Sequence, residues 1–479
     1  MTAATTLASD RLPFGRLSAF SLAGLPLGAL AATLGVYLPK YFASHIGLSL
    51  AAVGFAFTGV RLFDMLLDPG IGIAMDQTRT RLGRYRAWLL LGIPVLGVPV
   101  YMLYMAPPGV PLPYLVGWLI VYYVGASVVA LSQASWASVI ASKYNERSRV
   151  FGAVQIASTV AATLVLFVPT IVAIAGPKLF GHKLPFNEVQ SMGWFVLLVI
   201  PLGIIVATLF TPERLVVEHS SEKVTLKDYL EMAWWPEMRR IVVAAFCLTL
   251  GPGWMAAMYL FYFHDSRGFT GDVSRYLLAL YIGAGVLGAW GLSWLATRLG
   301  KHRTLILCST LYSIGLMVLN FLPKGSLIPA AIVMFVLGFL AAGFVLLGRA
   351  MCSDAGDAIR LAKGKHRQSV LYAMMTMVEK IGGALAIGLT FTILQMVGYQ
   401  AKDGVQNTPA AIHNLELVYL IGPITFVMLG GACYIGYKLD HKRHAEIRAE
   451  LDVRDAQIEP DAVLETLGGG IVLPPAPAE

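Results

Sequence analysis

The stretch RLGRYRAWLL, from Arg81 to Leu90, returns later in the chain as RLGKHRTLIL, from Arg298 to Leu307. Each copy is a short basic segment that leads into a long apolar run. The first copy follows the second apolar run of the chain, and the second copy follows the eighth. A repeat at equivalent places is typical of a chain built from two related halves. The sequence therefore predicts two similar units.

The apolar runs around this repeat are long enough to cross a membrane. Of the 479 residues 57% are hydrophobic and 13% are charged, whereas a soluble domain carries about 25% charged residues. Runs of about 20 apolar residues match the length of a membrane-spanning helix. The runs lie near residues 17–43, 48–74, 87–106, 112–141, 150–175, 192–211, 240–263, 274–297, 303–322, 327–351, 369–398 and 414–437. We therefore predict an all-α membrane protein with twelve transmembrane helices in two six-helix halves, the major facilitator architecture.

The longest polar interruption between these runs follows the sixth one and divides the chain. We predict an N-terminal six-helix bundle over 1–211, a cytoplasmic linker over 212–238 and a C-terminal bundle over 239–437. The linker is expected to include a helix around Thr225 to Trp234. The charged tail at 438–479 is predicted to be a solvated, partly disordered extension.

The positive charge of the chain indicates its orientation in the membrane. Its net charge of +8 comes from Lys and Arg that gather in alternate loops, and the side of a membrane protein that carries such loops is cytoplasmic. We predict a multi-pass protein of the cell (inner) membrane with both termini in the cytoplasm. The segment from Met1 to Arg16 has no signal-peptide pattern, and the charge distribution does not indicate nucleic-acid binding.

Three charged residues interrupt the second apolar run, in the segment GVRLFDMLLDPG. Arg61, Asp64 and Asp68 are spaced i, i+3 and i+7, so they share one helix face. Two carboxylates one turn apart can supply oxygen ligands to Na⁺ or share a proton, and Arg61 can orient them. Pro69 favours a broken, cavity-lining helix. The alternative is an interhelical salt bridge without a ligand.

A lysine interrupts the eleventh run. Lys380, in MMTMVEKIGGALAIG, is too deep in the run to reach a membrane surface. It can approach the acidic pair of the second run, so that an entering cation changes its partner; otherwise it is a fixed counter-ion. Glu379 precedes it, about 100° around the helix, and we assign it no role.

Several polar residues near the ends of runs are weaker candidates. Trp136 can stack on a sugar or an acyl chain, with Ser132 and Gln133 as hydrogen-bonding neighbours, or it can be an interfacial anchor. The candidates for a cytoplasmic gate, or alternatively for a simple helix-end salt bridge, are Arg349, Asp354 and Asp357. The pair His264 and Asp265 is expected in a loop.

Other functional classes lack their motifs in this sequence. The four cysteines occur singly, which disfavours a metal centre or a disulfide framework. A GxxxxGK[ST] loop is absent, and so are the HExxH and nucleophile-elbow patterns. We therefore predict neither an enzyme nor a bound cofactor other than a coupling ion.

The segment RLFDMLLDPGIGIAMDQTRTRLGRYRAW, from Arg61 to Trp88, resembles the signature of a known family. It is similar to the glycoside–pentoside–hexuronide:cation symporter family of the major facilitator superfamily, whose type member is the melibiose permease. The resemblance continues in MCSDAGD, from Met351 to Asp357, and in TMVEK, which ends at Lys380. It is scattered over nearly the whole membrane region.

The resemblance implies roles for five residues that match the family pattern. Asp64 and Asp68 correspond to the carboxylates of the coupling cation, which is Na⁺ if the symport is sodium-coupled. Thr376 is implied as their neighbour, Lys380 as the lysine that faces them, and Trp136 as the tryptophan of the sugar pocket.

The sugar-binding part of the family pattern is missing. Gly28 or a neighbour replaces an aspartate of the first span, and Ser132 replaces another in the fourth. The expected arginine of the fifth span falls at Ala157, and the expected tryptophan of the tenth falls near Val345. A galactoside would leave its hydroxyls unpaired here, at about 1–3 kcal/mol each.

These patterns predict a symporter that works by alternating access. It couples Na⁺ or H⁺ to the transport of a sugar, glycoside or hexuronide, and is expected to be a monomer in the lipid bilayer. The first alternative is a transporter of lysophospholipids or other amphipathic solutes, which the resemblance also includes. The second is a non-transporting signalling or scaffold relative, which has no need to bury the acidic pair and Lys380.

Overall fold

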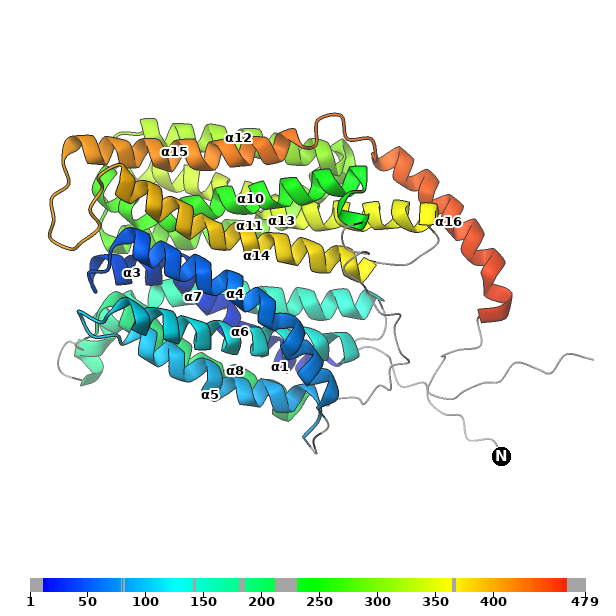
Figure 1. Ribbon diagram of the computed structural model, residues 1–479, viewed down its shortest axis with the longest axis horizontal. Coiled ribbons are helices and arrows are strands. Elements are labelled where there is room, and N and C mark those ends of the chain that lie inside the picture. Colours follow the sequence, from blue (N-terminus) through cyan, green and yellow to red (C-terminus); the bar gives the residue numbers. More distant parts are fainter. Residues whose placement is uncertain are drawn as a thin grey trace, which may run out of the picture.

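The computed structural model describes residues 12–78, 80, 82–140, 144–180, 186–211, 231–363 and 368–462. In these ranges the chain is helical and contains no strand (Figure 1). Its helices include 12 that are long and apolar enough to cross a membrane. The predicted all-α fold with twelve spans is therefore confirmed. Most of the predicted linker, residues 212–230, and the end of the tail, residues 463–479, lie outside the described residues.

The helices form two packed groups that follow each other along the chain. The first group consists of α1 (Phe14–Ser21), η1 (Leu22–Gly24), α2 (Leu25–Ala32), η2 (Thr33–Tyr37), α3 (Leu38–Ser44), α4 (Leu50–Gln77), α5 (Tyr85–Tyr104), α6 (Leu112–Ile140), α7 (Tyr144–Phe180) and α8 (Glu188–Phe210). The second group consists of α10 (Pro236–Phe261), η3 (Tyr262–Ser266), α11 (Gly271–Leu299), α12 (Lys301–Phe321), α13 (Leu327–Lys363), α14 (Gln368–Met396) and α15 (Pro409–Ala432), and α16 (His441–Ala462) follows it. We call these groups the N-half and the C-half.

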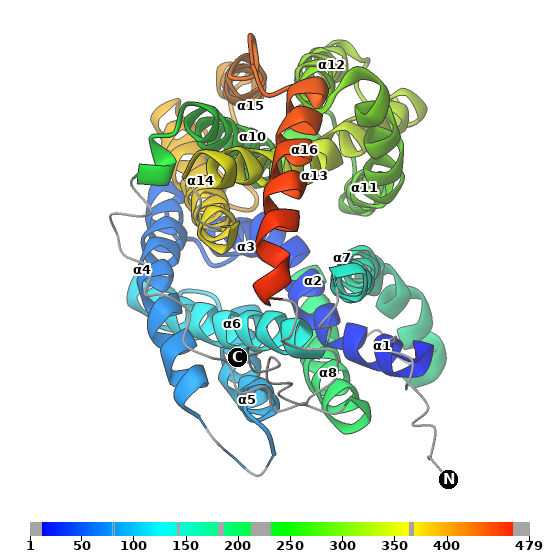
Figure 2. The ribbon, with the colours of Figure 1, turned by 90° about the vertical axis from the view of Figure 1, so that its right-hand side faces the viewer.

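The two halves lie side by side, and their helices run roughly along the long axis of the bundle (Figure 1). They contact each other where α4 packs on α14 and where α7 packs on α11. Seen from the end that carries α16, α12 and α15 are outermost in the C-half, whereas α13 and α14 lie on its inner side (Figure 2). We call this end of the bundle the α16 end.

The first span is not a continuous α-helix. Pro26 follows the 3₁₀ turn η1, and Pro39 follows the π-turn η2. A proline has no N–H to donate to the preceding turn, so the regular hydrogen-bond ladder is interrupted at both places. Within this span the Thr33 hydroxyl donates to the carbonyl of Ala29 at 3.0 Å and lies 2.5 Å from the hydroxyl of Tyr104.

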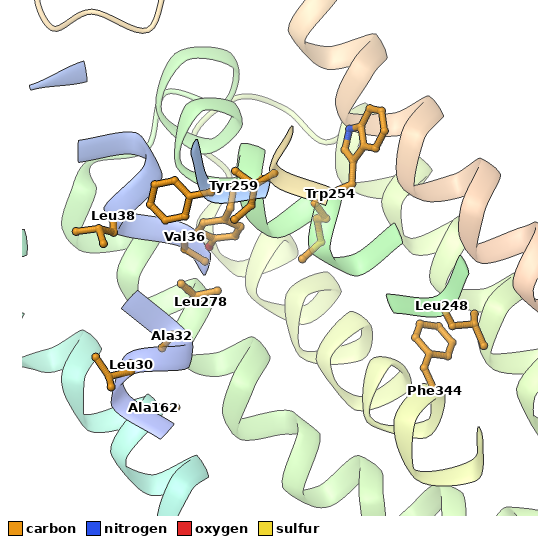
Figure 3. Close-up of a cluster of buried hydrophobic side chains, with 14 of the residues drawn as sticks. Leu30, Ala32, Val36, Leu38, Ala162, Leu248, Trp254, Tyr259, Leu278 and Phe344 are labelled. Atoms are coloured by element: carbon orange, nitrogen blue, oxygen red, sulfur yellow. The ribbon is translucent and has the colours of Figure 1, made fainter. Parts of the chain in front are cut away.

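An apolar cluster joins the first span to the C-half. Val36 lies beside Tyr259 and Leu278, which come from α10 and α11, whereas Leu38 points to the other side of the first span (Figure 3). All four side chains are buried. Because an apolar contact of this kind excludes water, it helps to close the bundle near the end opposite α16.

The predicted solvated extension from residue 438 contains a regular helix over residues 441–462. This segment is the helix α16, which begins after Asp440, whose carboxylate accepts a hydrogen bond from the backbone N–H of Arg443 at 2.9 Å. Ile447 and Leu451 are buried against the bundle. They are four residues apart and thus form one apolar stripe among charged residues. The charged composition of the segment hid this narrow stripe.

The expected loop at His264 and Asp265 is also corrected. Both residues lie in η3, a π-turn that continues α10. The carboxylate of Asp265 accepts a hydrogen bond from the hydroxyl of Tyr399. This contact ties the end of α10 to the segment after α14.

We predict that Gly288→Ala lowers the thermal stability of the purified protein. A Cβ at Gly288 of α11 would overlap the backbone of Phe339 on α13, because these helices touch there. Such overpacking costs about 1–3 kcal/mol. Gly283→Ala, on the same helix, is the matched control, since a Cβ there meets no atom within 4 Å. Thermal unfolding in detergent checks the prediction, and equal midpoints for the two variants would contradict it.

Candidate transport site between the halves

Asp64 is the most deeply buried carboxylate of the candidate site. Its side chain is 1% exposed. The hydroxyl of Ser127 on α6 donates to Oδ1 at 3.0 Å, and Nη1 of Arg61 lies 3.3 Å from Oδ2. The guanidinium of Arg61 stacks over the ring of Tyr123, 4.7 Å from its centroid. Asp64 is thus held by α4 and α6 of the N-half.

Lys380 joins this carboxylate to the other half of the molecule. From α14 its ammonium forms an ion pair with Asp68 and lies 3.7 Å from Oδ2 of Asp64. The hydroxyl of Thr58 on α4 also donates to the carbonyl of Ala384 on α14, at 2.7 Å. One lysine of the C-half therefore contacts both carboxylates of the N-half.

Close helix packing makes this reach possible. A Cβ at Gly54 of α4 would lie 3.2 Å from the Cα of Gly388 on α14. Small residues let two helix backbones approach in this way. Because α4 and α14 touch at these glycines, the side chain of Lys380 on α14 reaches the carboxylates on α4 across the boundary between the halves.

One carboxylate oxygen of the site, Oδ1 of Asp68, has no hydrogen-bond partner among the described residues. This oxygen is also buried. The two carboxylates are balanced by Arg61 and Lys380, so the cluster is neutral as it stands. An unpaired, buried carboxylate oxygen beside a second carboxylate fits a proton or a hard cation such as Na⁺.

Contacts between the halves also occur at the end opposite α16. Nη1 of Arg275 lies 2.5 Å from Oε1 of Glu188, and His45 lies 3.6 Å from Asp403. A cavity of about 330 Å³ is lined by His45, Glu188 and Asp403, with Lys40 also on its wall. The halves are therefore linked by charged groups at this end of the bundle.

Comparisons with known proteins agree with this architecture. The model of a family described as MFS/sugar transport protein matches residues 19–441. The chain belongs to this sugar transport family. It is a membrane transporter of the major facilitator type and not an enzyme.

Individual relatives are distant but match along almost their whole length. The isoprimeverose transporter of Lactiplantibacillus pentosus is 25% identical, over 95% of this chain and 94% of that protein. The sodium-dependent lysophosphatidylcholine symporter 1 of Xenopus tropicalis is 21% identical, over 92% of this chain and 91% of that protein. A solved bacterial homolog of the human lysosomal transporter Spinster has a TM-score of 0.64 at 12% identity, over 88% of this chain and 95% of that chain.

The structure brings together four of the residues singled out in the sequence: Arg61, Asp64, Asp68 and Lys380. Thr376, implied as a cation neighbour, lies one turn before Lys380 on α14 and is exposed. Its role as a cation ligand stays a prediction.

The residues of the implied sugar pocket are buried in this conformation. Trp136 is fully buried, with its ring edge-on to Phe20 at 5.2 Å between centroids. The hydroxyl of Ser132 lies 3.7 Å from the sulfur of Met75, and Gln133 is buried as well. Stacking of Trp136 on a solute stays a prediction, and it requires Trp136 to become exposed.

The departures from the family pattern have a structural cause at one position. A Cβ at Gly28 would overlap the backbone of Ser158 on α7. An aspartate cannot occupy that position while α2 and α7 touch there. By contrast, Val345, near which the expected tryptophan falls, is 46% exposed.

The three predicted gate residues do not form one network. Arg349 pairs with Glu379 on α14, whereas Asp354 pairs with Lys301 at 2.6 Å. Asp357 lies 3.1 Å from His444 on α16. Asp354 and Asp357 contact residues of the C-half and of α16, which matches the simpler alternative of helix-end salt bridges. Arg349 does not belong with them, because it lies about one turn farther into the span.

Sequence reasoning missed three residues that complete the cluster. These are Ser127 and Tyr123, on α6, and Thr58, on α4. Tyr123 and Ser127 are four residues apart and so share one face of a span. That spacing could have indicated a shared polar face of the span. It could not have identified Arg61 and Asp64 as the partners, because the spacing does not show which helix lies opposite.

We predict that Asp68 and Lys380 are strongly coupled in stability. Lys380→Gln or Asp68→Asn alone leaves an unpaired charge inside the bundle, which costs about 3–5 kcal/mol, whereas the double variant removes both charges and costs less. Thermal unfolding of the single and double variants measures the coupling. The same cycle on the exposed pair Arg443 and Glu446 is the control and should give under about 1 kcal/mol. Additive losses at Asp68 and Lys380 would refute the ion pair.

Proposed function

We propose that this chain is a cation-coupled symporter of a sugar-like solute, with Asp64 and Asp68 as the cation site. One observation carries the proposal: Lys380 of the C-half contacts two carboxylates of the N-half, the buried Asp64 and the partly buried Asp68. Charged groups in spans are costly and are typical of ion pathways. Oδ1 of Asp68, which has no hydrogen-bond partner among the described residues, is an oxygen that a cation or a proton can use.

The proposed coupling follows from charge. Without a cation, Lys380 neutralises Asp68 and links the halves. A Na⁺ or H⁺ at the carboxylates weakens their attraction for the ammonium, since charge pairs in a low-dielectric site interact strongly. The link between α4 and α14 is then loosened. Because the cation favours one arrangement of the halves over the other, it shifts their equilibrium.

The proposal includes an orientation in the membrane. The α16 end, which also carries the basic repeat segments, is placed in the cytoplasm, with both termini there and residues 212–238 as a cytoplasmic linker. The contacts of Glu188 with Arg275 and of His45 with Asp403 then close the outer side. Because the closed side is then the outer side, the conformation is proposed to be inward-facing. The proposal also takes the chain to be a monomer of the inner membrane.

The solute class is supported by the family and by its relatives. The matching model describes sugar transport, and the isoprimeverose transporter is among the relatives. A lysolipid is the second candidate, because a lysophosphatidylcholine symporter also matches most of the chain. The half-exposed Val345 leaves an apolar surface close to the place where the family pattern has a tryptophan. Such a surface suits an acyl chain or an apolar aglycone.

We predict that Asp68→Asn lowers cation-driven uptake at least about tenfold, because loss of one charged ligand removes more than about 1.4 kcal/mol of cation binding. The measurement is uptake of radiolabelled glycosides, hexuronides and lysolipids into proteoliposomes, with and without Na⁺ or proton gradients. The solute that accumulates identifies the cargo, and the effective gradient identifies the cation.

The matched control is Glu450→Gln, which removes a carboxylate from the exposed surface of α16. It is expected to leave uptake unchanged. If Asp68→Asn transports as well as the unaltered protein, the acidic pair is structural and the proposed coupling is wrong.

A further inference from the structure

A second ion pair adjoins the proposed cation site. Nη2 of Arg349 on α13 lies 2.7 Å from Oε2 of Glu379 on α14, and Nε lies 3.4 Å from Oε1. Two nitrogens on one edge of the guanidinium thus face the two oxygens of one carboxylate. This is the bidentate geometry that arginine forms with carboxylates. Glu379 directly precedes Lys380, so the two ion pairs are neighbours.

The surroundings of Arg349 indicate that it lines the route between the halves. It lies near the end of the apolar part of the 37-residue α13, one turn or more before Asp354, and its side chain is 49% exposed. The neighbouring Leu347 and Gly348 are buried in the C-half. A charged side chain in a span faces a water-filled route rather than lipid. In agreement, α13 and α14 lie on the inner side of the C-half (Figure 2).

We infer that Arg349 is a binding site for a carboxylate group of the solute, and that Glu379 occupies this site while the solute is absent. The inference rests on the proposed function and adds the charge of its substrate. Glu379 is 17% exposed, and it presents to Arg349 the same planar group that an acidic sugar carries. A solute carboxylate can replace it without leaving the guanidinium unpaired.

The charge balance of the two sites points the same way. The carboxylates of Asp64, Asp68 and Glu379 are matched by Arg61, Arg349 and Lys380, which gives a neutral group. One bound cation makes this group positive, and one monoanionic solute restores neutrality. A neutral complex is less costly to enclose in a low-dielectric bundle than a charged one. The cation also raises the affinity of the adjacent site for an anion, which is the coupling that symport requires.

Two probes that differ at one carbon test the inference. We would measure binding of 4-nitrophenyl β-D-glucuronide and 4-nitrophenyl β-D-glucoside to the purified full chain by equilibrium dialysis, in saturating Na⁺ at pH 6. The same comparison is made for the galacturonide and galactoside. In at least one pair, the carboxylate member is expected to bind about tenfold tighter or more, because a bidentate charge-assisted contact replaces a neutral one.

Two variants separate a binding role from a structural one. Arg349→Gln is expected to abolish the preference for the carboxylate member. Glu379→Gln frees the guanidinium from its internal partner, so it should bind the carboxylate member several-fold tighter. A merely structural salt bridge predicts the opposite, because loss of Glu379 would then only disturb the site. The double variant Arg349→Gln/Glu379→Gln has no unpaired charge and tests the loss of preference if Arg349→Gln does not fold.

Three results would overturn the inference: the neutral members bind as tightly as the acidic ones, Arg349→Gln keeps the preference, or no member of either pair binds. The failure of this inference is distinct from that of the proposed function. Cation-driven uptake of a neutral solute that is lost in Asp68→Asn and unaffected by Arg349→Gln would leave the symporter in place and remove only the carboxylate site.

Discussion

The placement of two carboxylates between apolar helices, Asp64 buried and Asp68 partly buried, is the constraint on which the rest of the structure depends. An isolated carboxylate in such a place costs several kcal/mol even after relaxation, and Asp64 has almost no contact with solvent. Arg61 and Ser127 compensate part of this cost from the N-half. The remaining charge is compensated by Lys380, which belongs to the C-half. The negative charge of the N-half at this site is therefore balanced only when Lys380 of the C-half is close.

This dependence links the packing of the helices to the chemistry of the site. The glycines at 54 and 388 bring α4 against α14, and the hydroxyl of Thr58 bonds across the same boundary. If the halves rock apart, Lys380 and Asp68 must separate, and each then needs a new partner. A small cation is such a partner for Asp68. The same ion pair is thus both a structural contact and a sensor of the cation.

How much of this was predictable depends on whether a feature is local in the sequence. The twelve spans and the shared face of Arg61, Asp64 and Asp68 follow from run length and helical period alone. The approach of Lys380 was predicted from the expected facing of the halves. The partner of Glu379 was not, because a helical period gives a direction around one helix but not the identity of the neighbour. The helix α16 was missed since only Ile447 and Leu451 bury an apolar stripe in a charged segment.

The departures from the family pattern and the pair of Arg349 and Glu379 concern the same problem of solute recognition. At Gly28 the backbone of Ser158 is so close that no carboxylate fits, and Ser132 is buried against a methionine. The N-half therefore offers a solute fewer charged groups than the family pattern implies. Arg349 and Glu379 supply charged groups from the opposite side, on helices of the C-half, next to the lysine that responds to the cation. Moving recognition to that side places solute and cation on adjacent residues of α14, where each alters the electrostatic field felt by the other.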